Sequence, residues 1–214
     1  MMFLGPVGPA RARNKVPIIG VTGPIGAGKS VVSALFARWG AVVVSGDNIG
    51  RAVVDASPRL RWQLARAFGA DILRRGHLDR ALLAERAFAG RDGILRLNSI
   101  VHPPLVREMQ RQIRRARRRP EVRAVVVDAA LLVEWGQGQI GWDWLVGVWA
   151  PWQIRRARLH RKGWTDRQIR DRAGGQATWA ARRRICNLVV KNDASTAILQ
   201  RRARLCWEKM VSLD

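Results

Sequence analysis

Hydrophobic residues fall into short continuous runs that alternate with stretches of helical spacing. The run at 16–22 ends in a glycine-rich turn, and apolar residues recur at helical spacing from Val32 to Trp39. Short apolar runs bounded by turns are typical of strands buried on both faces, as in parallel sheets. Further runs of this kind end at Ser45, Asp128, Ala150 and Lys191. We therefore predict an α/β fold with a five-stranded parallel sheet flanked by helices.

Two segments interrupt this alternation. Residues 51–120 show helical spacing only, which predicts an all-helical insertion with separate helices at 93–101 and 103–119. Residues 151–185 are arginine-rich and helical, and the glycines at 163, 174 and 175 suit hinges, so we expect a mobile lid there. The remaining segments are an N-terminal extension at 1–15 and a core formed by 16–50, 121–150 and 186–214.

Composition indicates a folded protein of a reducing compartment. The chain has 214 residues, 48% of them hydrophobic, which is enough to bury a substantial core. Its two cysteines, Cys186 and Cys206, have neither metal-ligand nor disulfide-framework spacing. No apolar run approaches the roughly 18 residues that a membrane span needs. We expect a cytoplasmic monomer that is not associated with membranes.

The formal net charge of +23 raises the question of nucleic acid as a partner. Arginine is spread along the whole chain, and no RNA-binding or helix-turn-helix signature accompanies it. Salt-sensitive, nonspecific affinity for polyanions is therefore what we expect of this charge.

The most specific motif lies between the first predicted strand and the first predicted helix. Residues 23–30, GPIGAGKS, match G-x-x-x-x-G-K-[ST] in full, and this context is the one that a phosphate-binding P-loop requires. Backbone N–H groups would surround the phosphates, Lys29 would reach the β- and γ-phosphates, and Ser30 would bind Mg²⁺. The predicted nucleotide contacts are Gly23, Ile25, Gly26, Ala27, Gly28, Lys29, Ser30 and Val31.

Other features narrow the class of P-loop protein. The GTPase base-recognition signature N-K-x-D is missing from the sequence, and a motor or translocase would need a longer chain. A small kinase with an acceptor-binding insertion and an arginine-bearing lid remains, with ATP and Mg²⁺ as cofactors. A P-loop ATPase associated with nucleic acid is the alternative that the charge suggests.

Motifs over residues 18–200 resemble, in order, those of dephospho-coenzyme A kinases. The segments LDRALLAERAF and LNSIVHPPLVREM are similar to the acceptor domain of that family, and VVVDAALLVE and RLHRKGWTDRQIRDRAGGQ resemble its D-x-P-L-L-x-E segment and its lid. The chain departs from the family pattern at Ser45, where an aspartate is usual, and at Lys162, where an acidic or amide residue is usual.

The resemblance implies phosphorylation of the ribose 3′-hydroxyl of dephospho-coenzyme A by ATP, the last step of coenzyme A synthesis. It implies that Arg161 stabilises charge on the transferred phosphoryl group and that Asn192 lies near the adenine. Asp47, at a strand end, is the candidate base for the acceptor hydroxyl. The expected acceptor contacts are Asp47, Arg80, His102, Asp128 and Leu131.

Several alternatives stay open at this point. Another small alcohol or a nucleotide could be the acceptor. Asp47 could cap a helix beginning at Asn48, His102 could be a packing residue at a helix start, and Asp128 could cap a loop.

Overall fold

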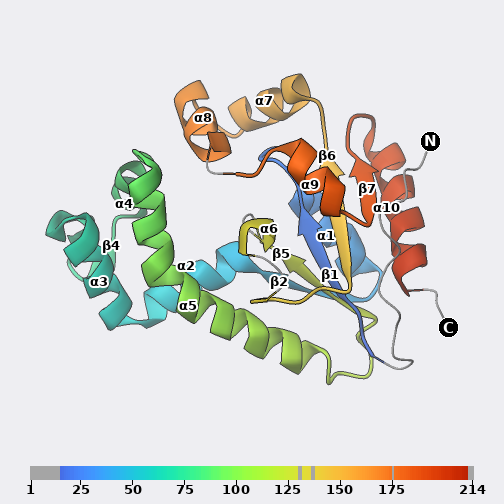
Figure 1. Cartoon of the computed structure of the whole chain (residues 1–214), viewed down its shortest axis with the longest axis horizontal. Coiled ribbons are helices and arrows are strands. Elements are labelled where there is room, and N and C mark those ends of the chain that lie inside the picture. Colours follow the sequence, from blue (N-terminus) through green and yellow to red (C-terminus); the bar gives the residue numbers. More distant parts are fainter. Residues whose placement is uncertain (1–14, 130–131, 136–137, 175, 212–214) are drawn as a thin grey trace. The chain divides into compact units, whose positions relative to one another are not determined.

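The structure, a computed structural model, describes residues 15–129, 132–135, 138–174 and 176–211 (Figure 1). The expectations for residues 1–14, for Leu131 and for Gly175 lie outside these ranges. The chain divides into two compact units, one formed by Met1–Ser45 with Arg111–Asp214 and the other by Gly46–Gln110.

The first unit is built on a parallel sheet of five strands in the order β2-β5-β1-β6-β7. Every strand pair in it is parallel, and its central strand β1 lies between β5 and β6. This confirms the predicted α/β fold with a five-stranded parallel sheet. The strands are β1 Ile18–Thr22, β2 Ala41–Ser45, β5 Ala124–Asp128, β6 Trp144–Trp149 and β7 Leu188–Lys191.

The strand registers bring several carboxyl ends to one edge of the sheet. Asp128, the last residue of β5, pairs with Ser45 of β2 and with Val21 of β1, and Thr22 pairs with Gly147. Ligands of parallel α/β sheets bind beyond this edge.

Helices α1 (Lys29–Arg38) and α10 (Thr196–Val211) pack together beside the sheet. The ring centroids of Phe36 and Trp207 lie 5.6 Å apart in this core. The same core buries strand residues such as Ile19 and Val126. The helices after β5 and β6 are α6 Leu132–Trp135, α7 Trp152–His160, α8 Asp166–Gly174 and α9 Trp179–Ile185.

The second unit has a hydrophobic core of its own, which includes the buried side chains of Leu64, Ile72 and Ala87. Its elements are α2 Gly46–Ala56, α3 Pro58–Phe68, the 3₁₀ helix Ala70–Ile72, β3 Leu73–Arg74, β4 His77–Leu78, α4 Arg80–Phe88 and the greater part of α5 Arg91–Ala116.

The expectation of helices only at 51–120 was wrong at one place. Strands β3 and β4 form a short antiparallel hairpin, in which Leu73 pairs with Leu78. Its two turn residues, Arg75 and Gly76, have φ angles of 50° and 78°. Two positive φ angles in a two-residue turn match the twist of a hairpin, and only the glycine signals this in the sequence.

The two helices expected at 93–101 and 103–119 form one helix, α5, with Pro103 and Pro104 inside it. Proline removes a hydrogen bond from a helix interior, which is why a break was expected. The apolar spacing continues across the prolines, however: Leu97 and Val101 pack on the core of the unit, and Leu105 is buried. Burial on both sides of the prolines offsets the lost backbone bonds, because tertiary packing dominates helix stability.

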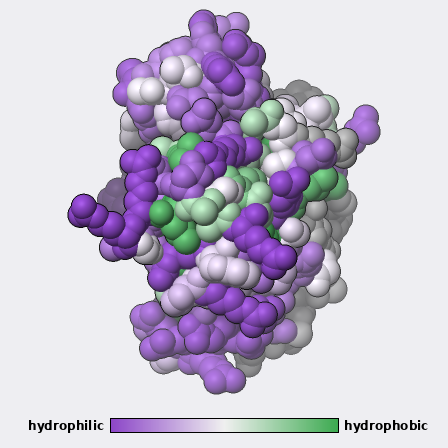
Figure 2. Space-filling model, turned by 90° about the vertical axis from the view of Figure 1, so that its left-hand side faces the viewer, coloured by the Kyte–Doolittle hydropathy of each residue, from purple (hydrophilic) through white to green (hydrophobic). Residues whose placement is uncertain are grey.

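Hydrophilic residues predominate on the face of the molecule that Figure 2 shows, and hydrophobic residues gather in a smaller central area. Within the described residues, no helix combines the length and the apolar character needed to cross a bilayer.

Candidate active site

The phosphate loop joins the end of β1 to the start of α1 and has a tight backbone. The Ala27 N–H donates to the Pro24 carbonyl at 3.1 Å, and Gly28 adopts the left-handed conformation with φ of 96° just before α1. A Cβ atom on Gly23 would lie 2.2 Å from the Val148 carbonyl oxygen, and one on Gly28 would lie 2.2 Å from Asn192 Nδ2. The loop therefore requires glycine at both positions.

The first turn of α1 supplies the charged and hydroxyl groups of the loop. Lys29 Nζ donates to the Gly23 carbonyl at 2.9 Å, so the ammonium lies back across the loop that begins at that residue. The Ser30 and Val31 side chains are exposed beside it. The helix dipole favours a phosphate at this end of α1. The eight nucleotide contacts predicted between Gly23 and Val31 thus belong to one loop and helix start, whereas Arg161 and Asn192, also predicted to bind the nucleotide, follow later in the chain.

Two side chains of the 151–185 segment contact the loop backbone at Ile25. Gln176 Oε1 accepts from the Ile25 N–H at 3.1 Å, and Arg155 Nη1 donates to the Ile25 carbonyl at 3.3 Å. Arg155 Nε also donates to the Ala150 carbonyl at 3.0 Å. Burial lowers the pKa of Arg155. No sequence motif singles out Arg155 among so many arginines.

Asn192, just after β7, is buried with 5% of its surface exposed and contacts the opposite side of the loop. Its Nδ2 donates to the Ala27 carbonyl at 2.8 Å. Arg158 of α7 donates in turn to Asn192, both to the backbone oxygen and to Oδ1, at 3.1 Å each. The predicted contact of Asn192 with adenine stays a prediction.

A fully buried arginine, Arg182 of α9, lies at the end of β1. It donates from Nη1 to Thr22 Oγ1 and from Nε to the Ala177 carbonyl at 3.1 Å. Burying a charged group is costly unless hydrogen bonds compensate it, so these contacts fix the position of α9 against the strand that leads into the loop. No sequence motif identified Arg182.

Asp128 lies at the end of β5, and its Oδ2 accepts from Ser33 Oγ at 3.1 Å. Ser33 lies one helical turn after Ser30 on α1, and residues three apart are neighbours on a helix. The Asp128 carboxylate is therefore beside the first turn of α1, where the phosphate loop ends.

The other predicted acceptor residues belong to the second unit. Asp47 is exposed in the first turn of α2, which begins at Gly46, so it does not cap a helix starting at Asn48. Arg80 forms an ion pair of 2.6 Å with Asp55. His102 is half-buried within α5, and this burial lowers the pKa of its imidazole.

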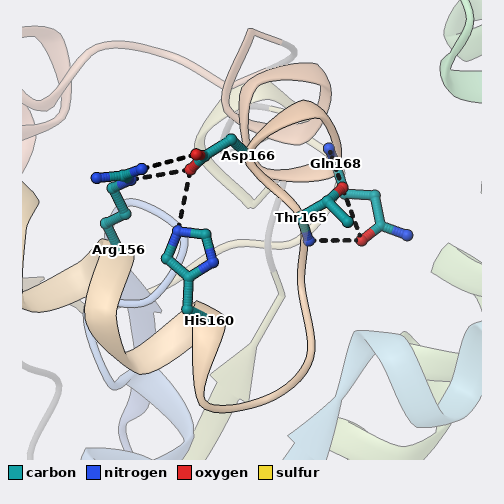
Figure 3. Close-up of polar contacts among 5 residues, drawn as sticks. All are labelled: Arg156, His160, Thr165, Asp166 and Gln168. Carbon is teal, nitrogen blue, oxygen red and sulfur yellow. Dashed lines mark hydrogen bonds and ion pairs between the residues drawn. The ribbon is translucent and has the colours of Figure 1, made fainter.

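A compact ion network joins α7 to α8, as Figure 3 shows. Arg156 donates from Nε and Nη2 to the two carboxylate oxygens of Asp166 at 2.8 and 2.7 Å, and His160 Nε2 lies 3.0 Å from Asp166 Oδ1. The hydrogen bond from Arg156 is the main reason why the pKa of Asp166 falls to about 2. At the start of α8, Gln168 Oε1 accepts from the Thr165 N–H at 2.9 Å.

Two other arginines of the predicted lid, Arg161 and Arg172, lie outside the network that Figure 3 draws. Arg161 is exposed, and its Nε donates to the Ala157 carbonyl at 3.4 Å. The Arg172 guanidinium stacks on Trp164, 4.6 Å from the ring centroid. Both are on the 151–185 segment that also carries the loop contacts of Arg155 and Gln176.

A five-stranded parallel sheet whose first strand leads into a complete phosphate loop defines a P-loop nucleotide-binding protein, and the arginine-bearing segment beside the loop is typical of the kinases of that class. Comparison with family models gives the particular kind: the model described as dephospho-CoA kinase matches residues 17–197. The chain belongs to the dephospho-CoA kinase family.

Curated relatives agree with this assignment. A dephospho-CoA kinase of Corynebacterium diphtheriae is 35% identical over 197 residues, which cover 91% of this chain and 98% of the relative. A dephospho-CoA kinase of Mycolicibacterium paratuberculosis is 40% identical over 195 residues, covering 90% of this chain. The chain spans only 47% of that second, longer relative.

Solved structures share the fold. TT1252 from Thermus thermophilus superposes with a TM-score of 0.77 at 27% identity, covering 94% of this chain and 100% of that one. Dephospho-CoA kinase from Campylobacter jejuni superposes with a TM-score of 0.61 at 18% identity, covering 92% and 98%.

Proposed function

We propose that this chain transfers the γ-phosphoryl group of ATP to the ribose 3′-hydroxyl of dephospho-coenzyme A, giving ADP and coenzyme A. The observation that carries the proposal is the complete phosphate loop between β1 and α1, which Gln176 and Arg155 contact from the 151–185 segment. The family match supports the acceptor, because it runs from the strand before the loop through the helical unit and the lid.

The loop holds the phosphates of ATP through its inward N–H groups and the start of α1. Lys29 moves from the Gly23 carbonyl to the β- and γ-phosphates, and Arg161 neutralises charge on the transferred group. Phosphoryl transfer depends on such positioning and electrostatic stabilisation more than on covalent participation of the protein.

Mg²⁺ fits the donor groups beside the loop. The Ser30 hydroxyl and the Asp128 carboxylate are hard oxygen donors, and Mg²⁺ in kinases is held by few protein oxygens together with substrate phosphates. Ser30 would bind the ion directly, and Asp128 would contact it or its water. When bound, the ion neutralises phosphate charge.

The helical unit is proposed to bind the acceptor through Arg80 and His102. The 3′-oxygen attacks the γ-phosphorus, the bond to the β–γ bridging oxygen breaks, and ADP leaves with that oxygen. The proton of the hydroxyl goes to Asp47, because an alcohol is a poor nucleophile at neutral pH and a positioned base contributes about 10²- to 10⁴-fold. Asp128 and Leu131 are the remaining proposed acceptor contacts.

The test is a phosphorylation assay with Mg-ATP and dephospho-coenzyme A, compared with gluconate, simple sugars and nucleoside monophosphates. We expect turnover with dephospho-coenzyme A, and a product with its new phosphate on the 3′-oxygen by ³¹P NMR. Faster turnover of another acceptor by the same preparation would overturn the assignment of the substrate.

A further inference from the structure

Arg158 and Asn192 connect helix α7 to the backbone of the phosphate loop. The guanidinium donates from Nη2 to the backbone oxygen and to Oδ1 of Asn192, each at 3.1 Å. The Asn192 amide then donates from Nδ2 to the Ala27 carbonyl at 2.8 Å. The Asn192 side-chain amide therefore connects Arg158 of α7 to the backbone at the middle of the loop.

The Asn192 amide is held at both ends in a single orientation. Its Oδ1 only accepts and its Nδ2 only donates, while Arg158 only donates and the Ala27 carbonyl only accepts. Turning the amide over would place two donors together and two acceptors together. The backbone of Asn192 is fixed as well, since its N–H donates to the Trp149 carbonyl at 2.7 Å.

This orientation determines where one loop N–H points. In a trans peptide the C=O and the next N–H point in opposite directions, and the described chain contains no cis peptide. With the Ala27 carbonyl directed at Asn192, the Gly28 N–H points away from Asn192, as it must to meet a phosphate held by the loop. Gly28 suits this contact because Asn192 Nδ2 occupies the space that a Cβ atom would need.

The arginine is not arranged for stability alone. Its second terminal nitrogen, Nη1, is buried and has no hydrogen-bond partner within the described residues. Burial, and secondarily the charge of Arg161, lower the pKa of Arg158. An unsatisfied buried donor is costly, so Arg158 keeps its contacts with Asn192 at some cost in stability.

We propose that Arg158 is a positioning residue for ATP binding, which acts through Asn192 to hold the Ala27–Gly28 peptide with its N–H directed at the phosphates. The inference rests on the proposed nucleotide site and not on the identity of the acceptor.

A double-mutant cycle tests whether Arg158 acts through Asn192. The variants are R158A, N192A and the double variant, and the readout is calorimetric titration with ATP and Mg²⁺ without an acceptor. Each single change should weaken ATP binding about tenfold, the size expected of a hydrogen bond to a charged group, and the double variant should be about as weak as either one. Effects that add would overturn the proposal.

Two further variants keep the result interpretable. R158K retains a donor for Asn192 and should recover part of the affinity, whereas R201A removes an exposed arginine of α10 and should bind ATP like the parent. If N192A does not fold, R158A and R158K decide alone. Wild-type ATP affinity in folded R158A overturns the proposal. The proposal is also overturned if R158K binds ATP no more tightly than R158A. Normal ATP binding without turnover of dephospho-coenzyme A would instead refute only the proposed function.

Discussion

The Gln176 side chain accepts a hydrogen bond from the Ile25 N–H at 3.1 Å, although the two residues are 151 positions apart in the chain. The contact ties the segment after α8 to the phosphate loop. It means that a change well outside the GxxxxGKS motif should alter nucleotide binding.

Gln176→Ala should therefore weaken ATP binding by roughly 2- to 10-fold, because a net hydrogen bond contributes about 0.5–1.5 kcal/mol. Equilibrium titration with ATP and Mg²⁺ measures the effect. Gln153→Ala, an exposed glutamine of α7, is the matched control and should bind normally. Equal affinities for the two variants would mean that the Gln176 contact does not support the loop.

Lys29→Ala should abolish most phosphoryl transfer while leaving the fold intact. The Lys29 ammonium donates to the Gly23 carbonyl of the loop, and in the reaction it would stabilise phosphate charge, where losing one such group costs about 10²- to 10³-fold. We expect kcat/KM to fall by at least about 100-fold, with a thermal midpoint close to that of the parent. Near-normal transfer by the folded variant would refute the assignment of the loop.

Asp47→Asn tests the proposed base. Asparagine cannot take the proton, so kcat should fall by at least roughly tenfold while ATP binding persists. Asp47 lies in the first turn of α2, where losing a negative charge costs only about 0.3–1 kcal/mol, so thermal stability should change little. If the folded variant turns over dephospho-coenzyme A at the normal rate, Asp128 becomes the next candidate for the base.

The two thiols should be inert in the folded protein. Burial raises the pKa of Cys186 to about 12 and that of Cys206 to about 11, so at pH 8 almost no reactive thiolate is present. We expect slow labelling by a thiol reagent under native conditions and complete labelling in denaturant. Rapid native labelling of either cysteine, located by mass spectrometry, would contradict the buried positions in the structure.

The ion network of α7 and α8 should survive mild acid. Because the pKa of Asp166 is depressed to about 2 in the folded state, its contribution to stability is present above its unfolded value near 3.8 and is lost as the pH falls through about 2. The difference in thermal midpoint between the parent and Asp166→Asn should persist from pH 7 to about 4 and shrink below. A difference that disappears by pH 5 would show that Arg156 does not hold the carboxylate.

The phosphate loop could be predicted because its chemistry is local. A glycine-rich turn between a buried run and a helical pattern, ending in Lys29 and Ser30, is recognisable within a few residues. The hairpin turn at Arg75 was missed because Gly76 is its one local signal, and a single glycine also suits a connection between helices. The continuity of α5 was missed because packing on both sides of Pro103 outweighs the low helix propensity of proline, and this packing is not visible in the local sequence.

The arginines that contact the phosphate loop or the residues beside it could not be identified from the sequence. Arg155, Arg158 and Arg182 lie among many arginines of similar spacing, and what distinguishes them is contact with residues far away in the chain. These contacts are therefore recognisable only once the fold is known. The roles of Asp47 and Arg161, the acceptor contacts, the monomeric state and the weak affinity for polyanions stay predictions.

The separate core of the second unit has a consequence for how acceptor preference can change. Residues 46–110 form one uninterrupted stretch that buries its own apolar side chains, whereas the nucleotide-binding unit is assembled from two stretches. The proposed acceptor contacts Asp47, Arg80 and His102 all lie in that stretch, so this part of acceptor recognition is inherited as a single cassette. Exchange of this cassette between relatives can alter the alcohol that receives the phosphate while the loop, its glycines and its supporting arginines remain untouched.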